Sequence, residues 1–275
     1  MHVSLISVEE LKKPDARRII IDTRLRKPYE TAHIGGAIWM RWEEWCEQAP
    51  DYAGESLKAP GYWGKLADPV QNAFAKRLGD IGITNDAEIV VYSAGPRSRG
   101  SDGRVAWMLL YLGANNVRLL DGAWQDWLDQ GGLVEAGCPV MVEKKFELKP
   151  QEVRRALLSD WQDQIINGGA IAIDTRTKPE FMGECHDYQP RKGRLPGSVS
   201  VPFGTMFDSN RKYVSRDQYL NRLPAASPKP IVTYCEVGVR AATVSLLHEI
   251  YTGEIIPVYD GSIMEWALDP SLPML

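Results

Sequence analysis

Short runs of β-branched and apolar residues alternate along the chain with segments in which apolar residues recur every three or four positions. The runs predict buried strands, most clearly at Ile19–Asp22, Glu88–Ser93, Val117–Leu120, Ile171–Asp174 and Ile231–Tyr234. The helical periodicity predicts helices at Val70–Leu78, Arg104–Leu112, Gln151–Leu158 and from about Arg240 to Ile250. Because strands alternate with helices, we expect an α/β fold whose mostly parallel sheets are flanked by helices on both faces.

Residues 41–69 show neither pattern. They are rich in Trp, Tyr, Gly and Pro, so we expect an irregular excursion there. The residue pattern leaves open whether the tryptophans at 39, 42, 45 and 63 pack this excursion or line a cleft.

The second half of the chain repeats the features of the first half in the same order. Ile171-Ala-Ile-Asp-Thr-Arg176 matches Ile19-Ile-Ile-Asp-Thr-Arg24, and Asp260-Gly261 with Trp266 matches Asp121-Gly122 with Trp127 at the same spacing. Three further pairs agree: Lys27-Pro28 with Lys178-Pro179, the glycine turn after His33 with Gly193–Phe203, and Ile89–Ser93 with Ile231–Cys235. Five matches in one order indicate a duplication.

The repeat predicts two tandem doubly wound domains. We place the first at residues 1–135 and the second at residues 151–275. The linker, 136–150, is marked by Gly137, Pro139, Lys144-Lys145 and Pro150.

The composition of the chain argues against binding of nucleic acids, membranes and metals. The chain of 275 residues has a net charge of −4, which gives no support for a nucleic-acid surface. No apolar run approaches the about 20 residues that span a bilayer, and the first residues lack the features of a signal peptide, so we expect a cytoplasmic protein that binds no membrane. Its four cysteines are scattered without a C-x-x-C pair, so we expect no metal and no cofactor.

Cys235 is the main candidate for chemistry. It follows a buried strand, lies in a loop that contains Gly238, and precedes a helix. Amide N–H groups at a helix start lack intrahelical partners, and together with the helix dipole they stabilise a nearby anion and favour a thiolate. This context favours a nucleophile over the alternative, a buried structural cysteine.

The two halves differ at this position. Ser93 stands where the second half has Cys235, and the distance to the following Asp-Gly is 28 positions (Ser93 to Asp121) against 25 (Cys235 to Asp260). A serine hydroxyl without a base is a far poorer nucleophile than a thiol. The arginines of the first half's longer loop, Arg97, Arg99 and Arg104, fit a surface loop better than the alternative, a reach across a cleft between the domains.

The segment Cys235-Glu-Val-Gly-Val-Arg240 resembles the active-site loop of the rhodanese family, which often has the form C-x-x-G-x-[ST/R]. The resemblance covers nearly the whole chain and implies tandem rhodanese domains of the thiosulfate/3-mercaptopyruvate sulfurtransferase type, the first inactive, with Ser93 at the cysteine position, and the second active. It implies that a sulfane sulfur passes from thiosulfate or 3-mercaptopyruvate to cyanide, a small thiol or a thioredoxin-like protein through a persulfide on Cys235. The amides of Glu236, Val237, Gly238, Val239 and Arg240 would then hold the terminal sulfur.

The donor is less clearly indicated. Glu236 beside the pocket would repel a dianion such as thiosulfate. Arg191, Lys192 and Arg194 precede a Leu-Pro-Gly turn near which family members bind donor anions, so Arg191 and Arg194 are candidates for substrate binding, against the alternative of a solvated basic loop. Arg240 could add positive charge to the pocket or brace the loop against a carboxylate.

Two other functions compete. A rhodanese-like domain can serve as a non-catalytic binding or regulatory module, but the intact cysteine loop argues against this. A phosphatase or arsenate reductase of the same fold is disfavoured, because the related phosphatases have their arginine six positions after the cysteine, and here Arg240 follows Cys235 by five.

Overall fold

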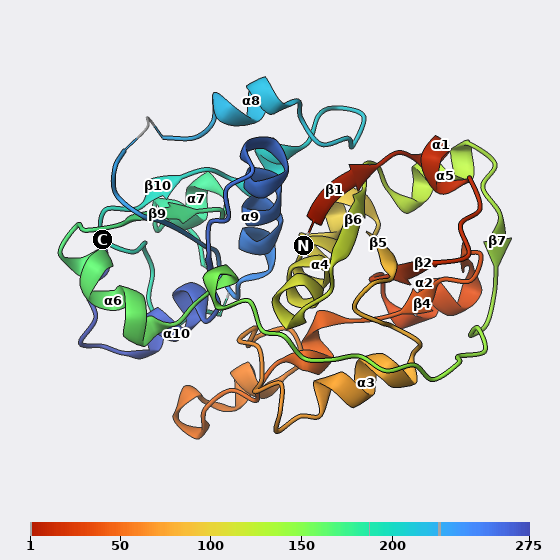
Figure 1. The fold of residues 1–275 in the computed structure, drawn as a ribbon. Coiled ribbons are helices and arrows are strands. Elements are labelled where there is room, and N and C mark those ends of the chain that lie inside the picture. The colour runs from red at the N-terminus through yellow and green to blue at the C-terminus, as the bar shows by residue number, and fades with distance from the viewer. Residues whose placement is uncertain (1, 187, 225–226) are drawn as a thin grey trace. The chain divides into compact units, whose positions relative to one another are not determined.

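The runs predicted as strands form two five-stranded sheets in the computed structural model, which describes residues 2–186, 188–224 and 227–275 (Figure 1). The first sheet has the order β1-β6-β5-β2-β4 and the second the order β8-β12-β11-β9-β10, with every pairing parallel. Matching strands of the two halves therefore occupy matching places. The bounds are β1 (His2–Ile6), β2 (Arg18–Asp22), β4 (Ile38–Trp39), β5 (Glu88–Tyr92), β6 (Asn116–Leu120), β8 (Arg155–Ala156), β9 (Ile171–Asp174), β10 (Val199–Ser200), β11 (Ile231–Tyr234) and β12 (Val258–Tyr259).

Helices follow the strands as the alternating pattern predicts. In the first half they are α1 (Val8–Leu11), α2 (Arg26–Thr31), α3 (Phe74–Asp80), α4 (Ser101–Leu112) and α5 (Trp124–Asp129). In the second half they are α6 (Leu158–Ile166), α7 (Lys178–Phe181), α8 (Arg216–Leu220), α9 (Val239–Thr252) and α10 (Ser262–Leu268). A short antiparallel pair, β3 (His33–Ile34) with β7 (Val134–Glu135), completes the first half. The predicted fold class, two doubly wound α/β sheets flanked by helices, is confirmed.

The chain divides into two compact units that do not follow the sequence halves strictly. Unit 1 consists of Met1–Trp42, Asp68–Gln151 and Phe207–Tyr213, and unit 2 of Glu43–Ala67, Glu152–Met206 and Val214–Leu275. Each unit thus takes one segment from the half that mainly builds the other. The boundaries proposed at 135 and 151 describe the sequence repeat rather than this packing, and they stay a prediction.

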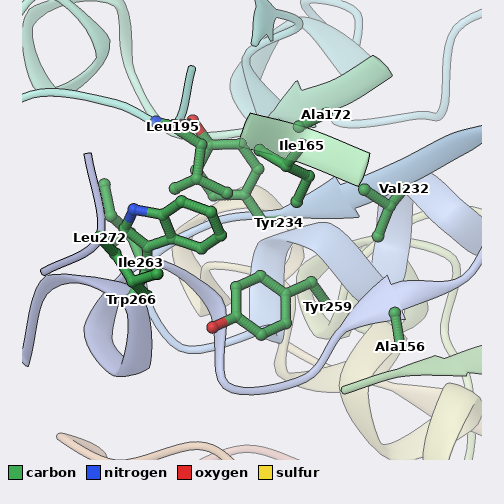
Figure 2. Packing of buried hydrophobic residues seen from close by; sticks show 10 residues of the cluster. All are labelled: Ala156, Ile165, Ala172, Leu195, Val232, Tyr234, Tyr259, Ile263, Trp266 and Leu272. Atoms are coloured by element: carbon green, nitrogen blue, oxygen red, sulfur yellow. Dashed lines mark hydrogen bonds between the residues drawn. The ribbon is translucent and has the colours of Figure 1, made fainter. Parts of the chain in front are cut away.

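The core of unit 2 shows how the strand pattern places helices on both faces of the sheet. Val232 and Tyr234 are two positions apart in β11, so their side chains point to the same face of the sheet. There they pack in one cluster with Trp266 of α10 and Ile165 of α6 (Figure 2). Helix α9 packs on β11 and β12 as well. Trp266 is fully buried and its indole N–H donates to the carbonyl of Pro273, so it anchors this core.

Both halves repeat a buried Asp-Arg pair at the carboxyl end of the strand beside the central one, which is β2 in the first sheet and β9 in the second. An Asp22 carboxylate oxygen accepts the amide N–H of Arg24 at 2.8 Å, and the guanidinium of Arg24 pairs with the same carboxylate at 2.6 Å. Asp174 and Arg176 do the same at 2.9 and 2.6 Å. The aspartates therefore close the strand ends by binding backbone amides, as expected from their position.

Two predicted helices need correction. Gln151–Leu158 is not a helix: a single 3₁₀ turn, Glu152–Arg154, leads into β8, and α6 begins only at Leu158. Residues 155 and 156 pair with β12, and tertiary pairing of this kind overrides a local helical preference. The helix predicted at Val70–Leu78 begins at Phe74, because the Asp68 carboxylate accepts the amides of Val70 and Gln71 and holds the preceding residues in a turn.

The irregular excursion at 41–69 is confirmed. It contains three short 3₁₀ helices, Trp42–Trp45, Asp51–Ala53 and Glu55–Lys58, and one isolated bridge between Cys46 and Leu66. Trp42, Trp45 and Trp63 are buried, so they pack the excursion.

Truncating the core anchor should cost much of the stability of unit 2. We expect Trp266→Ala to lower the free energy of unfolding by about 3–5 kcal/mol, because it removes a fully buried indole and leaves a cavity. Urea unfolding followed by circular dichroism measures this. Tyr52→Ala is the matched control, since Tyr52 is also aromatic and in unit 2 but 80% exposed, and equal losses in both variants would contradict the assignment.

Candidate active site

Cys235 lies at the carboxyl end of β11, the central strand of the second sheet. Ligand sites in doubly wound folds lie outside the carboxyl ends of the strands, so this is the expected edge for chemistry. The loop from Cys235 to Gly238 leads directly into α9, a helix of 14 residues. The sequence prediction of strand, loop and helix in this order is confirmed.

The loop turns into the helix at Gly238, whose φ of 80° lies in the left-handed region that glycine adopts at no steric cost. Among the residues that the structure describes, no group accepts a hydrogen bond from the amides of Val237, Gly238 and Val239. These donors and the dipole of α9 together form a place where an anion is stabilised.

The loop is shielded from solvent. Cys235 is 1% exposed, and Val237 and Val239 are buried. The backbone at Gly64, in the excursion segment of unit 2, lies directly on Val237: a Cβ atom at position 64 would come within 2.0 Å of the carbonyl oxygen of Val237. Only glycine permits this approach, so Gly64 allows the excursion to cover the cysteine loop.

Helix α10 supports the cysteine loop through hydrogen bonds to the backbone of Cys235 and Glu236. The amide of Cys235 donates to Oγ of Ser262 at 3.2 Å, and the carbonyls of Cys235 and Glu236 accept the amides of Ile263 and Met264. Ser262 is buried and has a φ of 54°, a region that residues other than glycine rarely adopt. The first turn of α10 therefore fixes the position of the cysteine.

Arg240 braces the loop. Its guanidinium forms two hydrogen bonds with Glu180 of α7, at 2.9 and 2.8 Å, and Glu236 lies 3.7 Å away. Burial alone would lower the pKa of Arg240, but the hydrogen bonds of Glu180 and the charges of Cys235, Glu180 and Glu236 raise it above its usual value. Of the two roles open for Arg240, the bracing contact with a carboxylate is therefore present in the structure.

Glu180 is held in place for this contact. It is the third residue of α7, where its carboxylate accepts the amide of the N-cap residue Thr177 at 2.8 Å. Burial would raise the pKa of Glu180, but the hydrogen bonds and charge of Arg240, followed by the bonds from Thr177, lower it to about 2. Glu180 is therefore ionised at neutral pH and pairs with a cationic Arg240.

The two candidate donor-binding arginines have different surroundings. Arg191 donates to four carbonyl oxygens, those of Trp266, Ala267, Asp269 and Leu272, so it caps the end of α10.

Arg194 makes fewer hydrogen bonds than Arg191. Its guanidinium lies 4.7 Å from the ring of Phe181 in α7 and makes one long hydrogen bond, of 3.5 Å, to the carbonyl of the same residue. Phe181 directly follows Glu180 in α7, so of the two candidate donor-binding arginines Arg194 is the one that lies next to the helix that holds Arg240. A substrate role of either arginine stays a prediction.

The equivalent loop of unit 1 is closed on itself. Ser93 is buried, and its hydroxyl bonds to the hydroxyl of Ser98 at 2.9 Å and accepts the amide of Gly95 at 3.2 Å. A 3₁₀ turn, Gly95–Ser98, fills the place of the open curl. Ser93 thus replaces the thiol, and its hydroxyl is held by bonds within its own loop.

Sequence reasoning missed Glu180, Ser262 and Gly64. The repeat contained a signal for the first two. Aligned on the Lys-Pro dipeptides, Glu180 is matched by Tyr29, and aligned on Ser93 and Cys235, Arg240 is matched by Ser98, so both partners of the ion pair are absent from the first half. Aligned on the Asp-Gly dipeptides, Ser262 is matched by Ala123. No local signal marks Gly64, because its partner lies in the other half of the chain.

The described part of the chain holds no group of three or more His, Cys, Asp or Glu side chains that could bind a metal ion. It also holds no helix of the length and apolar character that crossing a membrane requires.

Known proteins resemble the chain over most of its length. A family model described as rhodanese-like domain matches residues 7–130 and 158–269. A thiosulfate sulfurtransferase from Gallus gallus is 26% identical over 247 residues, which cover 88% of this chain and 80% of that protein. A mitochondrial thiosulfate/3-mercaptopyruvate sulfurtransferase from Arabidopsis thaliana is 29% identical over 306 residues, which cover 96% of this chain and 75% of that protein. The crystal structure of SseA from Escherichia coli, 24% identical, shares the fold with a TM-score of 0.78 over 94% of this chain and 98% of that one.

Removing the charge of Glu180 should destabilise the protein in a pH-dependent way. Because the folded pKa of about 2 lies below the ordinary 4.5, the ionised carboxylate stabilises the fold above pH 4.5, and this contribution disappears as the pH falls towards 2. We expect Glu180→Gln to lower the free energy of unfolding by about 2–3 kcal/mol at pH 7 and by much less at pH 3.

Urea unfolding at pH 7, 5 and 3 measures the effect. The matched control is Glu184→Gln, an exposed neighbour, which should change stability little at any of these pH values. A Glu180→Gln loss of the same size at pH 3 and pH 7 would show that charge pairing with Arg240 is not the cause.

Proposed function

The chain belongs to the rhodanese-like domain family, and from this premise we propose that it is a sulfurtransferase that carries sulfur as a persulfide on Cys235. One observation carries the proposal: the cysteine lies at the carboxyl end of the central strand, beside three amide donors that no described residue uses. Terminal persulfide sulfur is anionic, and such donors stabilise an anion without a counter-ion.

The chemistry has two steps. In the first, the Cys235 thiolate attacks the outer sulfur of the donor and an S–S bond forms. The bond that held this sulfur breaks, and its electron pair leaves with the donor, as the enolate of pyruvate from 3-mercaptopyruvate or as sulfite from thiosulfate. In the second step a nucleophile such as cyanide, a small thiol or a thioredoxin-like thiol takes the outer sulfur, and the Cys235 thiolate is regenerated.

The amides of residues 236–240 would hold the charge of the outer sulfur between the two steps. Because Cys235 is 1% exposed, the proposal requires the backbone around Gly64 to yield when a donor enters. Closure afterwards would keep water and unrelated thiols away from the persulfide.

Of the two donors, 3-mercaptopyruvate fits the charges better. Arg240, Glu180 and Glu236 together carry a net charge of −1 beside the cysteine, so a monoanionic donor meets less repulsion than the thiosulfate dianion. Arg194 is the arginine we assign to the donor carboxylate, since the guanidinium of Arg191 is already occupied by four carbonyls.

Identity of the acceptor and the cytoplasmic location stay predictions. The relative from Arabidopsis thaliana is named as mitochondrial.

Intact mass spectrometry tests the persulfide. Incubation with 3-mercaptopyruvate should add one sulfur, about 32 Da, which cyanide removes. Cys235→Ser should gain no mass, whereas Cys138→Ser and Cys185→Ser, the matched controls at two exposed cysteines, should load like the unaltered protein. Failure of 3-mercaptopyruvate, thiosulfate and other sulfane donors to load Cys235 would leave the non-catalytic binding module as the function.

The charge of Glu236 should set the preference between donors. We expect Glu236→Gln to raise kcat/KM for thiosulfate relative to 3-mercaptopyruvate by about tenfold, because it removes one negative charge within a few ångströms of the incoming dianion. Steady-state rates with cyanide as the acceptor measure this ratio. Glu184→Gln serves as control and should leave it unchanged, and an unchanged ratio in Glu236→Gln would show that Glu236 does not face the donor.

A further inference from the structure

Unit 1 contains a pocket of about 570 Å³ at the carboxyl ends of β2 and β5. Drug-sized and cofactor-sized ligands occupy pockets of roughly 300–1,000 Å³, and doubly wound sheets bind them at this edge. We call it the arginine pocket, because Arg24, Arg41, Arg97 and Arg99 line it and no acidic residue does. The sulfur chemistry proposed for Cys235 uses none of these residues.

The four guanidinium groups are not equally engaged. Arg24 is paired with the buried Asp22, and Arg41 donates to the carbonyl of Thr23 at 3.0 Å. Arg97 and Arg99 are exposed, and neither forms an ion pair with any residue in the part of the chain that the structure describes. The pocket therefore carries positive charge that the protein itself leaves uncompensated.

The backbone adds to this field. Arg99 has a φ of 55°, and Gly100 follows with a φ of 89°, so the chain turns sharply into α4, whose first residue, Ser101, lines the pocket. Residues other than glycine rarely adopt this conformation, and such strain is often kept where a side chain must be aimed. Helix α4 has 12 residues, and the positive end of its dipole faces the pocket.

Asp102 is the acid that follows the two exposed arginines in sequence. It lies in the first turn of α4, is buried and does not line the pocket. Burial raises its pKa against the opposing effect of hydrogen bonds from its own amide, from Gly103 and from the hydroxyls of Ser93 and Ser98.

One wall of the arginine pocket is apolar. Leu25, which is 65% exposed, lies there with Pro28 and Trp124. The guanidinium of Arg24 stacks 4.1 Å from the ring of Trp124, so a planar cation and an aromatic surface adjoin. A ligand that fits both features has an anionic head and an apolar or planar body.

We propose that the arginine pocket binds a small organic anion, one in which a carboxylate, sulfonate or phosphate group is attached to an aryl or alkyl body. Binding is non-covalent, since Ser93 is bonded within its own loop and cannot carry sulfane sulfur. The first half of the duplication has thus kept an anion site while it lacks the reactive thiol. This site is separate from the proposed function and does not depend on it.

Calorimetric titration of the full chain tests the site. The Cys235→Ser variant is used throughout, so that no probe reacts at the thiol and the outcome is independent of sulfur transfer. Phenyl phosphate should bind saturably to the arginine pocket, and benzyl alcohol, with the same ring and no charge, should not. Inorganic phosphate should bind at least about tenfold more weakly than phenyl phosphate, because it makes no contact with the apolar wall.

Substitutions locate the binding. Arg97→Ala with Arg99→Ala should weaken phenyl phosphate binding about tenfold or more, and Leu25→Glu should abolish it, while all these positions are exposed and tolerate change. Arg17→Ala with Lys76→Ala removes the same two charges from exposed positions of unit 1 that do not line the pocket, and should leave the affinity unchanged. The proposal is overturned if phenyl phosphate does not bind, if the Arg97/Arg99 variant binds as tightly as its control, or if inorganic phosphate binds equally well.

Discussion

A buried guanidinium holds the reactive loop of this protein in its curl. Arg240 stands in the first turn of α9 and binds Glu180 of α7 with two short hydrogen bonds, with Glu236 close by. Breaking such a pair would leave a buried charge uncompensated, which costs several kcal/mol in proteins of any fold. The contact therefore ties the start of α9 to α7 and holds in place the loop whose amides at Val237, Gly238 and Val239 have no acceptor among the described residues.

The charge of the brace also shapes the chemistry. Two carboxylates face one guanidinium, so the surroundings of Cys235 are not strongly cationic, and the stabilisation of a sulfur anion falls to backbone dipoles. Dipoles of fixed direction need no counter-ion to move during the reaction, which suits a group that alternates between thiolate and persulfide. Burial of the loop strengthens each of these interactions by excluding water.

The duplicated halves show which parts of the framework are needed for folding and which for a site. Both keep the parallel sheet order and the buried Asp-Arg pair at a strand end. They differ in the loop after the central strand: one half has a cysteine, an open curl and a braced arginine, and the other a serine closed on itself and uncompensated arginines around a pocket. The same architecture thus supports two electrostatic environments, one built from amides and one from side-chain cations.

The sequence by itself determined the fold class, the duplication and the location of Cys235 between a strand and a helix, because each depends on residues that are neighbours in the chain. Strand and helix periodicities are local, and so is the spacing from Cys235 to Arg240. Tertiary structure alone decided the pairing of Arg240 with Glu180, 60 positions away, the cover of Val237 by Gly64, and the strand β8 where a helix was expected. It also brought Arg24 and Arg41 to the same pocket as Arg97 and Arg99. These contacts join residues far apart in the chain, and their energies come from burial and charge that exist only once the sheets have formed.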